Sequence, residues 1–139
     1  RPAPPTATRR PTSTPESTAT FLDPLFIESL TRVKDAVNQA GGVIDRFIKD
    51  QTEFECDQFA GYYDVVQSNR NATYDVPEAW LTSYNDALDI FLNNNSDLLS
   101  MCKAGETITA GQITDTARVG VEKSNLALDV ILNAALNLE

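Results

Sequence analysis

The two cysteines, Cys56 and Cys102, are the side chains whose type and spacing say most about chemistry in this chain. An even cysteine count in a protein from an oxidising compartment predicts a disulfide. Each cysteine lies on an apolar stripe with helical spacing, one near the start of its helix and the other near the end. If the two helices that carry them are antiparallel neighbours, both cysteines lie toward the same end of the helix pair. We therefore predict a Cys56–Cys102 disulfide. Two buried free thiols are the alternative.

The chain contains no histidine. It therefore lacks the usual general base at neutral pH and the commonest metal ligand. Glu53, Glu55 and Asp57 could offer oxygen ligands, but their spacing does not match a calcium-binding loop, and the acidic start of a helix explains them. We expect a protein that is not an enzyme, with no catalytic residue, no metal and no cofactor.

Four stretches of the chain repeat apolar residues in steps of three and four, the spacing of one helix face. The stripes are Phe26, Leu30, Val33, Val37, Ala40, Ile44 and Phe47; Cys56, Phe59, Tyr63 and Val66; Leu81, Tyr84, Leu88, Phe91, Asn95, Leu98 and Cys102; and Ala117, Val121, Ser124, Leu128, Ile131, Ala135 and Leu138. Asp23 is the expected N-cap of the first helix, with Pro24 in its first turn and an end near Lys49.

The first two stripes are out of phase after Phe47. A second helix is expected to begin between residues 51 and 54, because Asp50 with Glu53, or Thr52 with Glu55, can form a capping box. One long kinked helix over both stripes is the alternative.

Cap residues also predict the ends of the last two helices. Asp75 is the expected N-cap of the third, with Pro77 in the first turn and Gly105 at its end. Thr109 with Gln112 predicts a capping box for the fourth. Four amphipathic helices with short connections predict an all-α fold, an antiparallel (up-down) four-helix bundle over residues 21–139.

Residues 1–20 hold six Thr, two Ser and five of the seven Pro of the chain. They include no aliphatic side chain larger than alanine, so we expect a disordered Thr/Pro-rich spacer in front of the bundle. The spacer resembles the Thr/Pro-rich tethers of bacterial surface lipoproteins and of fungal wall proteins. That resemblance implies a location, cell surface or secreted, and no activity.

The remaining 8 basic and 19 acidic residues give residues 21–139 a net charge of −11. Such a domain repels nucleic acid and anionic membranes, so we expect no nucleic-acid partner. No apolar run is long enough to span a bilayer, and membrane contact is expected only through an anchor upstream of Arg1.

A helix-four surface is the strongest sign of a partner. Val119, Leu126 and Val130 form a second apolar stripe roughly opposite the first when plotted at about 100° per residue. A helix that is apolar on two sides usually has two partners, although scattered surface apolar residues are also normal. We predict contact with another protein, or self-association, through this stripe.

Six residues are candidates for an internal ligand pocket. The paired glycines Gly41 and Gly42 each cost the first helix about 1 kcal/mol relative to alanine. They indicate a backbone open to a ligand or a hinge, or else close helix packing or a kink. Asn95 falls at a core position, where an amide fixes helix register or lines a pocket. The six candidates are Gly41, Gly42, Tyr63, Trp80, Tyr84 and Asn95.

Two N-glycosylation sequons begin at Asn71 and Asn94. The first lies in a predicted loop, where a glycan fits, and the second adjoins the predicted core position Asn95. Asn71 is therefore the candidate glycosylation site if the source is eukaryotic.

The sequence as a whole favours a non-enzymatic, extracytoplasmic helical-bundle module that mediates protein–protein or structural interactions. The alternative is a carrier or sensor domain that binds a small apolar or amphipathic ligand between its helices. A filled core favours the interaction module, and an elongated apolar pocket favours the carrier.

Overall fold

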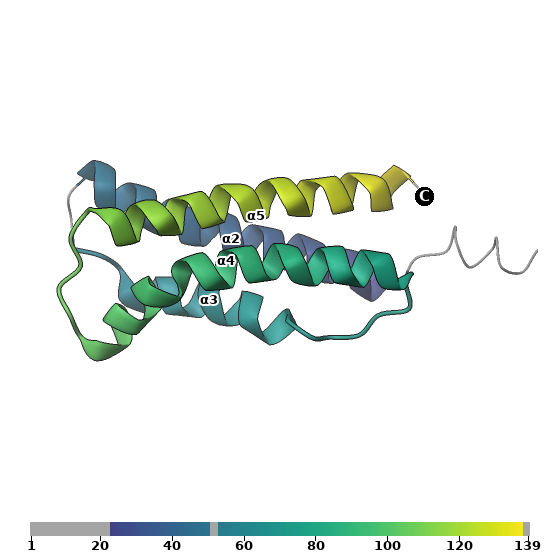
Figure 1. Cartoon of the computed structure of the whole chain (residues 1–139), viewed down its shortest axis with the longest axis horizontal. Helices are drawn as coiled ribbons and strands as arrows, with labels where there is room; N and C mark the ends of the chain where they lie inside the picture. Colours follow the sequence, from purple (N-terminus) through teal and green to yellow (C-terminus); the bar gives the residue numbers. More distant parts are fainter. Residues whose placement is uncertain (1–22, 51–52, 138–139) are drawn as a thin grey trace, which may run out of the picture.

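The structure, a computed structural model, describes residues 23–50 and 53–137. The described residues form four α-helices and no strand: α2 (Pro24–Asp50), α3 (Cys56–Asn69), α4 (Glu78–Ala104) and α5 (Gln112–Asn137). The helices pack side by side as a bundle (Figure 1). The predicted spacer, residues 1–20, lies outside the described residues.

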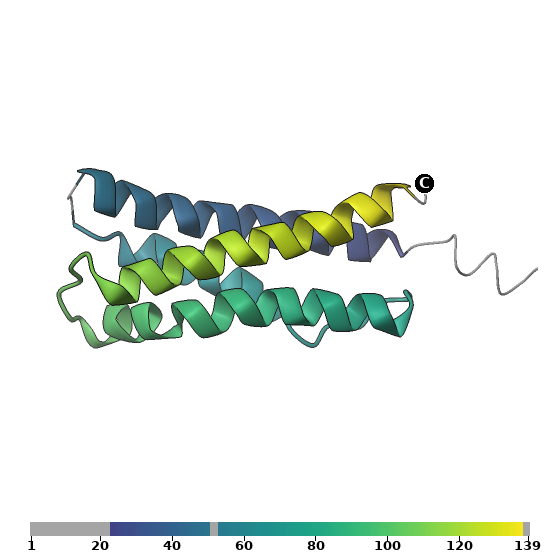
Figure 2. The ribbon, with the colours of Figure 1, turned by 45° about the horizontal axis from the view of Figure 1, so that its top comes forward.

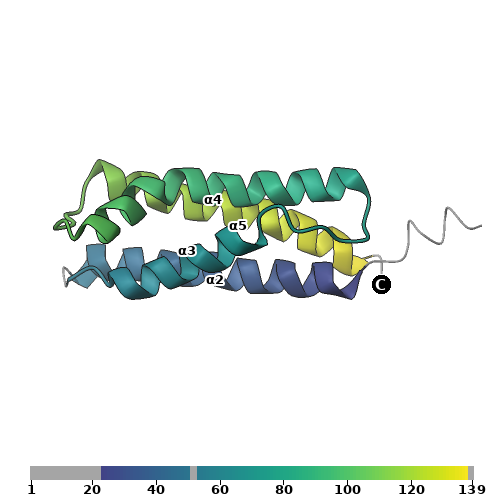
Figure 3. The ribbon, with the colours of Figure 1, turned by 90° about the horizontal axis from the view of Figure 1, so that it is seen from below.

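Each helix packs against two others. α4 lies against α5, α2 lies against α3, and contacts of α2 with α5 and of α3 with α4 close the ring. The end of α5 and the start of α2 lie at the same end of the bundle (Figure 2). α3 is 14 residues long, about half the length of its neighbours. The segment that joins α3 to α4 continues along the bundle beyond α3 (Figure 3), and its Tyr74 ring packs on Phe26 and Tyr84.

The predicted stripes form the core. Every described member of the four stripes is buried except Phe47, Cys56, Leu81 and Cys102, which are half-buried near the ends of the helices. Leu138 lies outside the described residues. Because burial of these side chains in one shared core is the main favourable contribution to folding, the spacing of apolar residues determines how the helices face one another.

α2 begins as predicted. The Asp23 carboxylate accepts a hydrogen bond from the Leu25 N–H at 3.0 Å, and the Asp23 carbonyl accepts one from the Phe26 N–H at 2.9 Å. Asp23 is therefore the N-cap, and Pro24 occupies the first helical position, where its missing N–H costs nothing.

α2 and α3 are separate helices, so the single kinked helix is excluded. The predicted capping box of Asp50 with Glu53 does not form: Asp50 belongs to α2, and the N-cap of α3 is Glu55, whose side chain makes no cap hydrogen bond. Thr52 lies outside the described residues. α3 starts later than predicted because Phe54, which continues the stripe of α2, is buried between Phe47 and Phe59 and holds the connection against the core.

The predicted N-caps of the last two helices are also wrong. The N-cap of α4 is Pro77 rather than Asp75, because the residue before a proline, Val76, disfavours the helical region. The N-cap of α5 is Gly111 rather than Thr109: the Gly111 carbonyl accepts from the Asp115 N–H, and the Thr114 hydroxyl accepts from the Gly111 N–H. Gly105 ends α4 as predicted, in the left-handed region with φ of 70°.

Candidate interaction surface

α5 packs through one face and exposes the opposite one. Its buried side chains are Thr114, Ala117, Val121, Ser124, Leu128, Ile131 and Ala135, together with the Gly120 backbone. The outer face of α5, defined here as Val119, Leu126 and Val130, is exposed to 43%, 67% and 69%. These are the three residues of the predicted second stripe. They do not belong to the core.

The contact of α5 with α2 occupies one flank of the helix. Three polar contacts join the two helices: Lys34–Asp129 at 3.1 Å, Asn125 Nδ2 donating to Asn38 Oδ1 at 2.5 Å, and Arg118–Asp45 at 3.2 Å. Across these three contacts the α2 partner moves from residue 34 to 38 to 45, while the α5 partner moves from 129 to 125 to 118. The two helices therefore run in opposite directions.

The contact of α5 with α4 is closer. A Cβ atom placed on Gly120 would clash with Asn94 Cβ, because it would lie closer than non-bonded Cβ contacts in real proteins essentially ever do. Ser124 Oγ donates to the Ala87 carbonyl at 2.9 Å across the same interface. α5 therefore already has two neighbours, and its outer face has no partner among the described residues.

A groove of about 460 Å³ lies beside one end of the outer face. It is lined by Asn94, Gly111, Gln112, Asp115, Thr116 and Val119. Asp115 and Glu122 are exposed carboxylates, and among the described residues no ion pair engages either of them. Lys123 is exposed as well, and it is the one basic residue on α5 besides Arg118. The surroundings of the outer face thus carry more unpaired negative than positive charge.

The paired glycines of α2 have different surroundings. A Cβ atom placed on Gly41 would lie 2.8 Å from Val121 Cγ1, which shows close packing of α2 on α5. A Cβ atom on Gly42 would meet only the Arg46 guanidinium at 3.4 Å. Close helix packing therefore explains Gly41.

The aromatic pocket candidates are parts of the core. Tyr63 donates from its hydroxyl to the Leu92 carbonyl at 3.1 Å, and Trp80 is half-buried against Phe26. Tyr84 is fully buried, its hydroxyl bonds to Ser29 Oγ, and burial raises its pKa to about 12. Burial also raises the pKa of Tyr63. None of the six pocket candidates lines the groove beside the outer face of α5, the cleft at Cys56 and Cys102 or the cavity next to that cleft.

Asn95 joins α4 to α5 in the core. Its Nδ2 atom donates to the Phe91 carbonyl at 2.9 Å and to the Ala117 carbonyl at 3.3 Å. Its Oδ1 atom is buried and has no hydrogen-bond partner among the described residues. The amide therefore acts as a donor between two helices, the geometry expected of a residue that fixes register.

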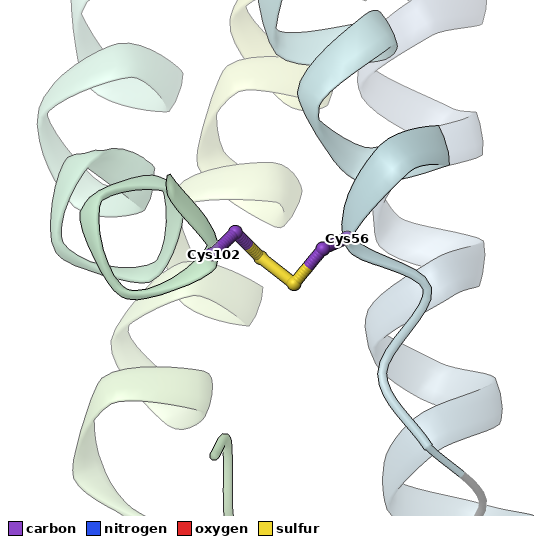
Figure 4. The surroundings of a disulfide bond; sticks show 2 residues. All are labelled: Cys56 and Cys102. Atoms are coloured by element: carbon purple, nitrogen blue, oxygen red, sulfur yellow. A yellow bond between two sulfur atoms is a disulfide. The ribbon is translucent and has the colours of Figure 1, made fainter. Parts of the chain in front are cut away.

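The predicted disulfide is present. Cys56 and Cys102 are bonded, with their Cα atoms 5.4 Å apart, and the bond joins the first residue of α3 to the last turn of α4 (Figure 4). Both cysteines line an open cleft of about 810 Å³, the disulfide cleft. The other residues that line it are Glu53, Phe54, Glu55, Asp57, Gln58, Gly105 and Glu106.

The two sequons differ in accessibility. Asn71 is exposed in the segment between α3 and α4, with φ of 73°. Asn94 is half-buried in the middle of α4, its Nδ2 atom donates to the Ile90 carbonyl at 2.7 Å, and Gly120 lies against it. Only Asn71 has an open side chain for a glycan.

Sequence reasoning missed two polar contacts that hold α3 and the following segment. Asn69 Oδ1 accepts from Ser29 Oγ at 3.0 Å and so extends the buried Ser29–Tyr84 contact to α3. Arg70 binds the Asp89 carboxylate through Nε at 2.6 Å and Nη2 at 2.9 Å, which lowers the pKa of Asp89. Ser29 lies beside Leu30 off the predicted stripe, so the apolar pattern carried no signal for it.

Among the described residues, no cluster of three or more His, Cys, Asp or Glu side chains is arranged to hold a metal ion. Within the same ranges, no helix is both long and apolar enough to cross a bilayer. Comparison of the chain with protein-family models, with curated proteins and with solved structures found no match.

Proposed function

We propose that the protein is a non-enzymatic, extracytoplasmic interaction module whose outer face of α5 docks on another protein. In this proposal residues 21–139 form an up-down four-helix bundle, and residues 1–20 are a Thr/Pro-rich tether at the cell surface or in a secreted protein. The Cys56–Cys102 disulfide supports an oxidising compartment, because such bonds persist outside the cytosol.

The observation that carries the proposal is the exposure of Leu126 and Val130, at 67% and 69%, on a helix that already packs on two neighbours. Exposed apolar side chains gathered on one face are typical of docking sites. The partner we propose carries positive charge around an apolar contact, because the chain has a net charge of −9 and unpaired carboxylates flank this face. Two copies of the chain would repel each other for the same reason.

The test is site-specific photo-crosslinking in the source cells. A benzoylphenylalanine residue replaces Leu126 in one strain and Leu25, which is 60% exposed on α2, in a matched strain. We expect a discrete crosslinked product from position 126 alone, and we expect Val130→Lys to remove it. Equal crosslinking from both positions, or none from position 126, contradicts the proposal.

Native mass spectrometry separates this function from the carrier alternative. The interaction module has the mass of the polypeptide alone, whereas a carrier retains a small molecule after gentle purification. A ligand-sized mass increment that disappears on unfolding would contradict the proposed function and support the carrier alternative.

A further inference from the structure

The disulfide is reachable from solvent in the folded protein. Cys56 and Cys102 are half-buried, and both line the disulfide cleft, which opens to solvent. A neighbouring cavity of about 410 Å³ adjoins it, and five residues line both: Glu53, Phe54, Cys56, Gly105 and Glu106. A small thiol can therefore enter the cleft beside the disulfide without unfolding of the bundle.

A thiol that approaches the disulfide through this cleft comes close to several negatively charged side chains. Four carboxylates line the cleft, at Glu53, Glu55, Asp57 and Glu106. Glu55 is neutralised by Arg46 at 3.0 Å, and no ion pair within residues 23–50 and 53–137 engages the other three. Lys103 directly follows Cys102 in the chain, but it does not line the cleft.

We propose that these carboxylates make the Cys56–Cys102 disulfide selective for the charge of the thiol that reduces it. Reduction begins when a thiolate attacks one cysteine sulfur. The S–S bond breaks, its electron pair leaves on the other cysteine, and that thiolate takes a proton from water. A second thiol then displaces the first from the mixed disulfide, so that two thiols are oxidised and both cysteines are reduced. The attacking species is an anion, and like charges in the cleft raise the energy of its approach.

The selectivity follows from the charge on the rest of the thiol. A thiol that carries an ammonium group attacks as a species of net charge zero, whereas one that carries a sulfonate attacks with two negative charges. We expect the first to react at least about tenfold faster than the second at low salt, beyond their difference on a neutral disulfide. Raising the ionic strength from about 0.01 M to about 1 M shortens the screening length from ~30 Å to ~3 Å and should remove the difference.

The experiment measures the rate at which 2-mercaptoethylamine and 2-mercaptoethanesulfonate reduce the disulfide of the folded protein. Each rate is divided by the rate at which the same thiol reduces bis(2-hydroxyethyl) disulfide, a neutral reference substrate, under the same conditions. In the variant Glu53→Gln/Asp57→Asn/Glu106→Gln we expect the ratio of the two rates to fall close to one. The matched control, Glu28→Gln/Asp35→Asn/Asp64→Asn, removes the same number of charges from exposed helix positions outside the cleft. It should keep most of the selectivity.

Three results overturn the proposal. Equal normalised rates for the two thiols show that the carboxylates exert no selective effect. Equal loss of selectivity in both triple variants assigns the effect to the net charge of the whole protein. A rate that does not depend on thiol concentration shows that reduction waits for unfolding, so that the cleft gives no access.

Discussion

At the scale of single residues, we expect ionisation of the buried Tyr84 hydroxyl to reduce the stability of the fold. Tyr84 is fully buried and bonds to Ser29, which in turn bonds to Asn69 of α3. One hydroxyl pair thus connects α2, α3 and α4 inside the core. Because an unpaired buried hydroxyl costs about 1–3 kcal/mol, removal of either partner should destabilise the bundle by that order.

The raised pKa of Tyr84 predicts a loss of stability in alkali. Its pKa is about 12 in the folded protein, against about 10 in the unfolded chain. The stabilisation is complete below pH 10 and is lost as the pH rises toward 12, because the unfolded state releases the proton first. Urea unfolding between pH 9 and 11.5 should show this decline, and Tyr84→Phe should make it shallower. Since the pKa of Tyr63 is also raised, part of the decline should remain. An unchanged slope in Tyr84→Phe contradicts the assignment.

Replacing Gly120 with alanine should have the opposite effect on stability from the same substitution at Gly61, an exposed glycine on α3. A Cβ atom at position 120 would clash with Asn94 Cβ, whereas one at Gly61 meets nothing within 4 Å. We expect Gly120→Ala to destabilise by about 1–3 kcal/mol through overpacking. Gly61→Ala should stabilise by about 0.5–1 kcal/mol through helix propensity. Thermal unfolding measures both. A neutral Gly120→Ala would mean that α4 and α5 can separate at little cost.

At the scale of the elements, the apolar spacing predicted the four helices and the faces that they bury. That spacing reports directly which side of a helix faces a core, so residues such as Leu30, Leu88 and Leu128 were placed correctly. Helix starts were predicted less well, because a neighbouring residue can override a cap residue. Val76 precedes Pro77 and disfavours the helical region, so α4 does not begin directly after Asp75.

The candidate sites also divide into features that the sequence predicted and features that only the structure shows. The exposed stripe of α5 follows from periodicity alone, since it depends on which face of one helix a residue occupies. The disulfide followed from periodicity together with the even cysteine count and the expected antiparallel order of the two helices that it joins. The cleft, the tight contact at Gly120 and the Ser29–Tyr84 pair depend on the separation of two helices. No local pattern encodes that separation, so these features required the structure.

At the scale of the whole molecule, the spacer prediction concerns residues 1–20. Because they offer no large apolar side chain to dock on the bundle, deleting them should change Tm by less than about 5 °C, roughly 1 kcal/mol for a domain of this size. Calorimetry of the two chains measures the difference. A larger drop would show that the segment packs on the bundle and is more than a tether.

The disulfide affects the stability of the whole chain because it closes a long loop. It joins residues 46 apart, and in the chain-entropy model such a link stabilises by up to ~4 kcal/mol. That is a large share of the ~5–15 kcal/mol typical of a domain. We expect Cys56→Ser/Cys102→Ser to fold with its helices intact and to unfold at lower urea concentration, because both cysteines lie at the edge of the core.

The state of the disulfide in the source organism tests the proposed location of the protein. Protein collected from its own source and alkylated without reductant should keep the mass of the unmodified chain, because neither Cys56 nor Cys102 offers a free thiol. Alkylation after reduction serves as the control and should add two groups. Two alkylated cysteines without reductant would show that the bond is absent where the protein works. The strongest support for an extracytoplasmic location would then be lost, while the proposed docking role of the outer face of α5, which depends on exposure and not on the disulfide, would be unaffected.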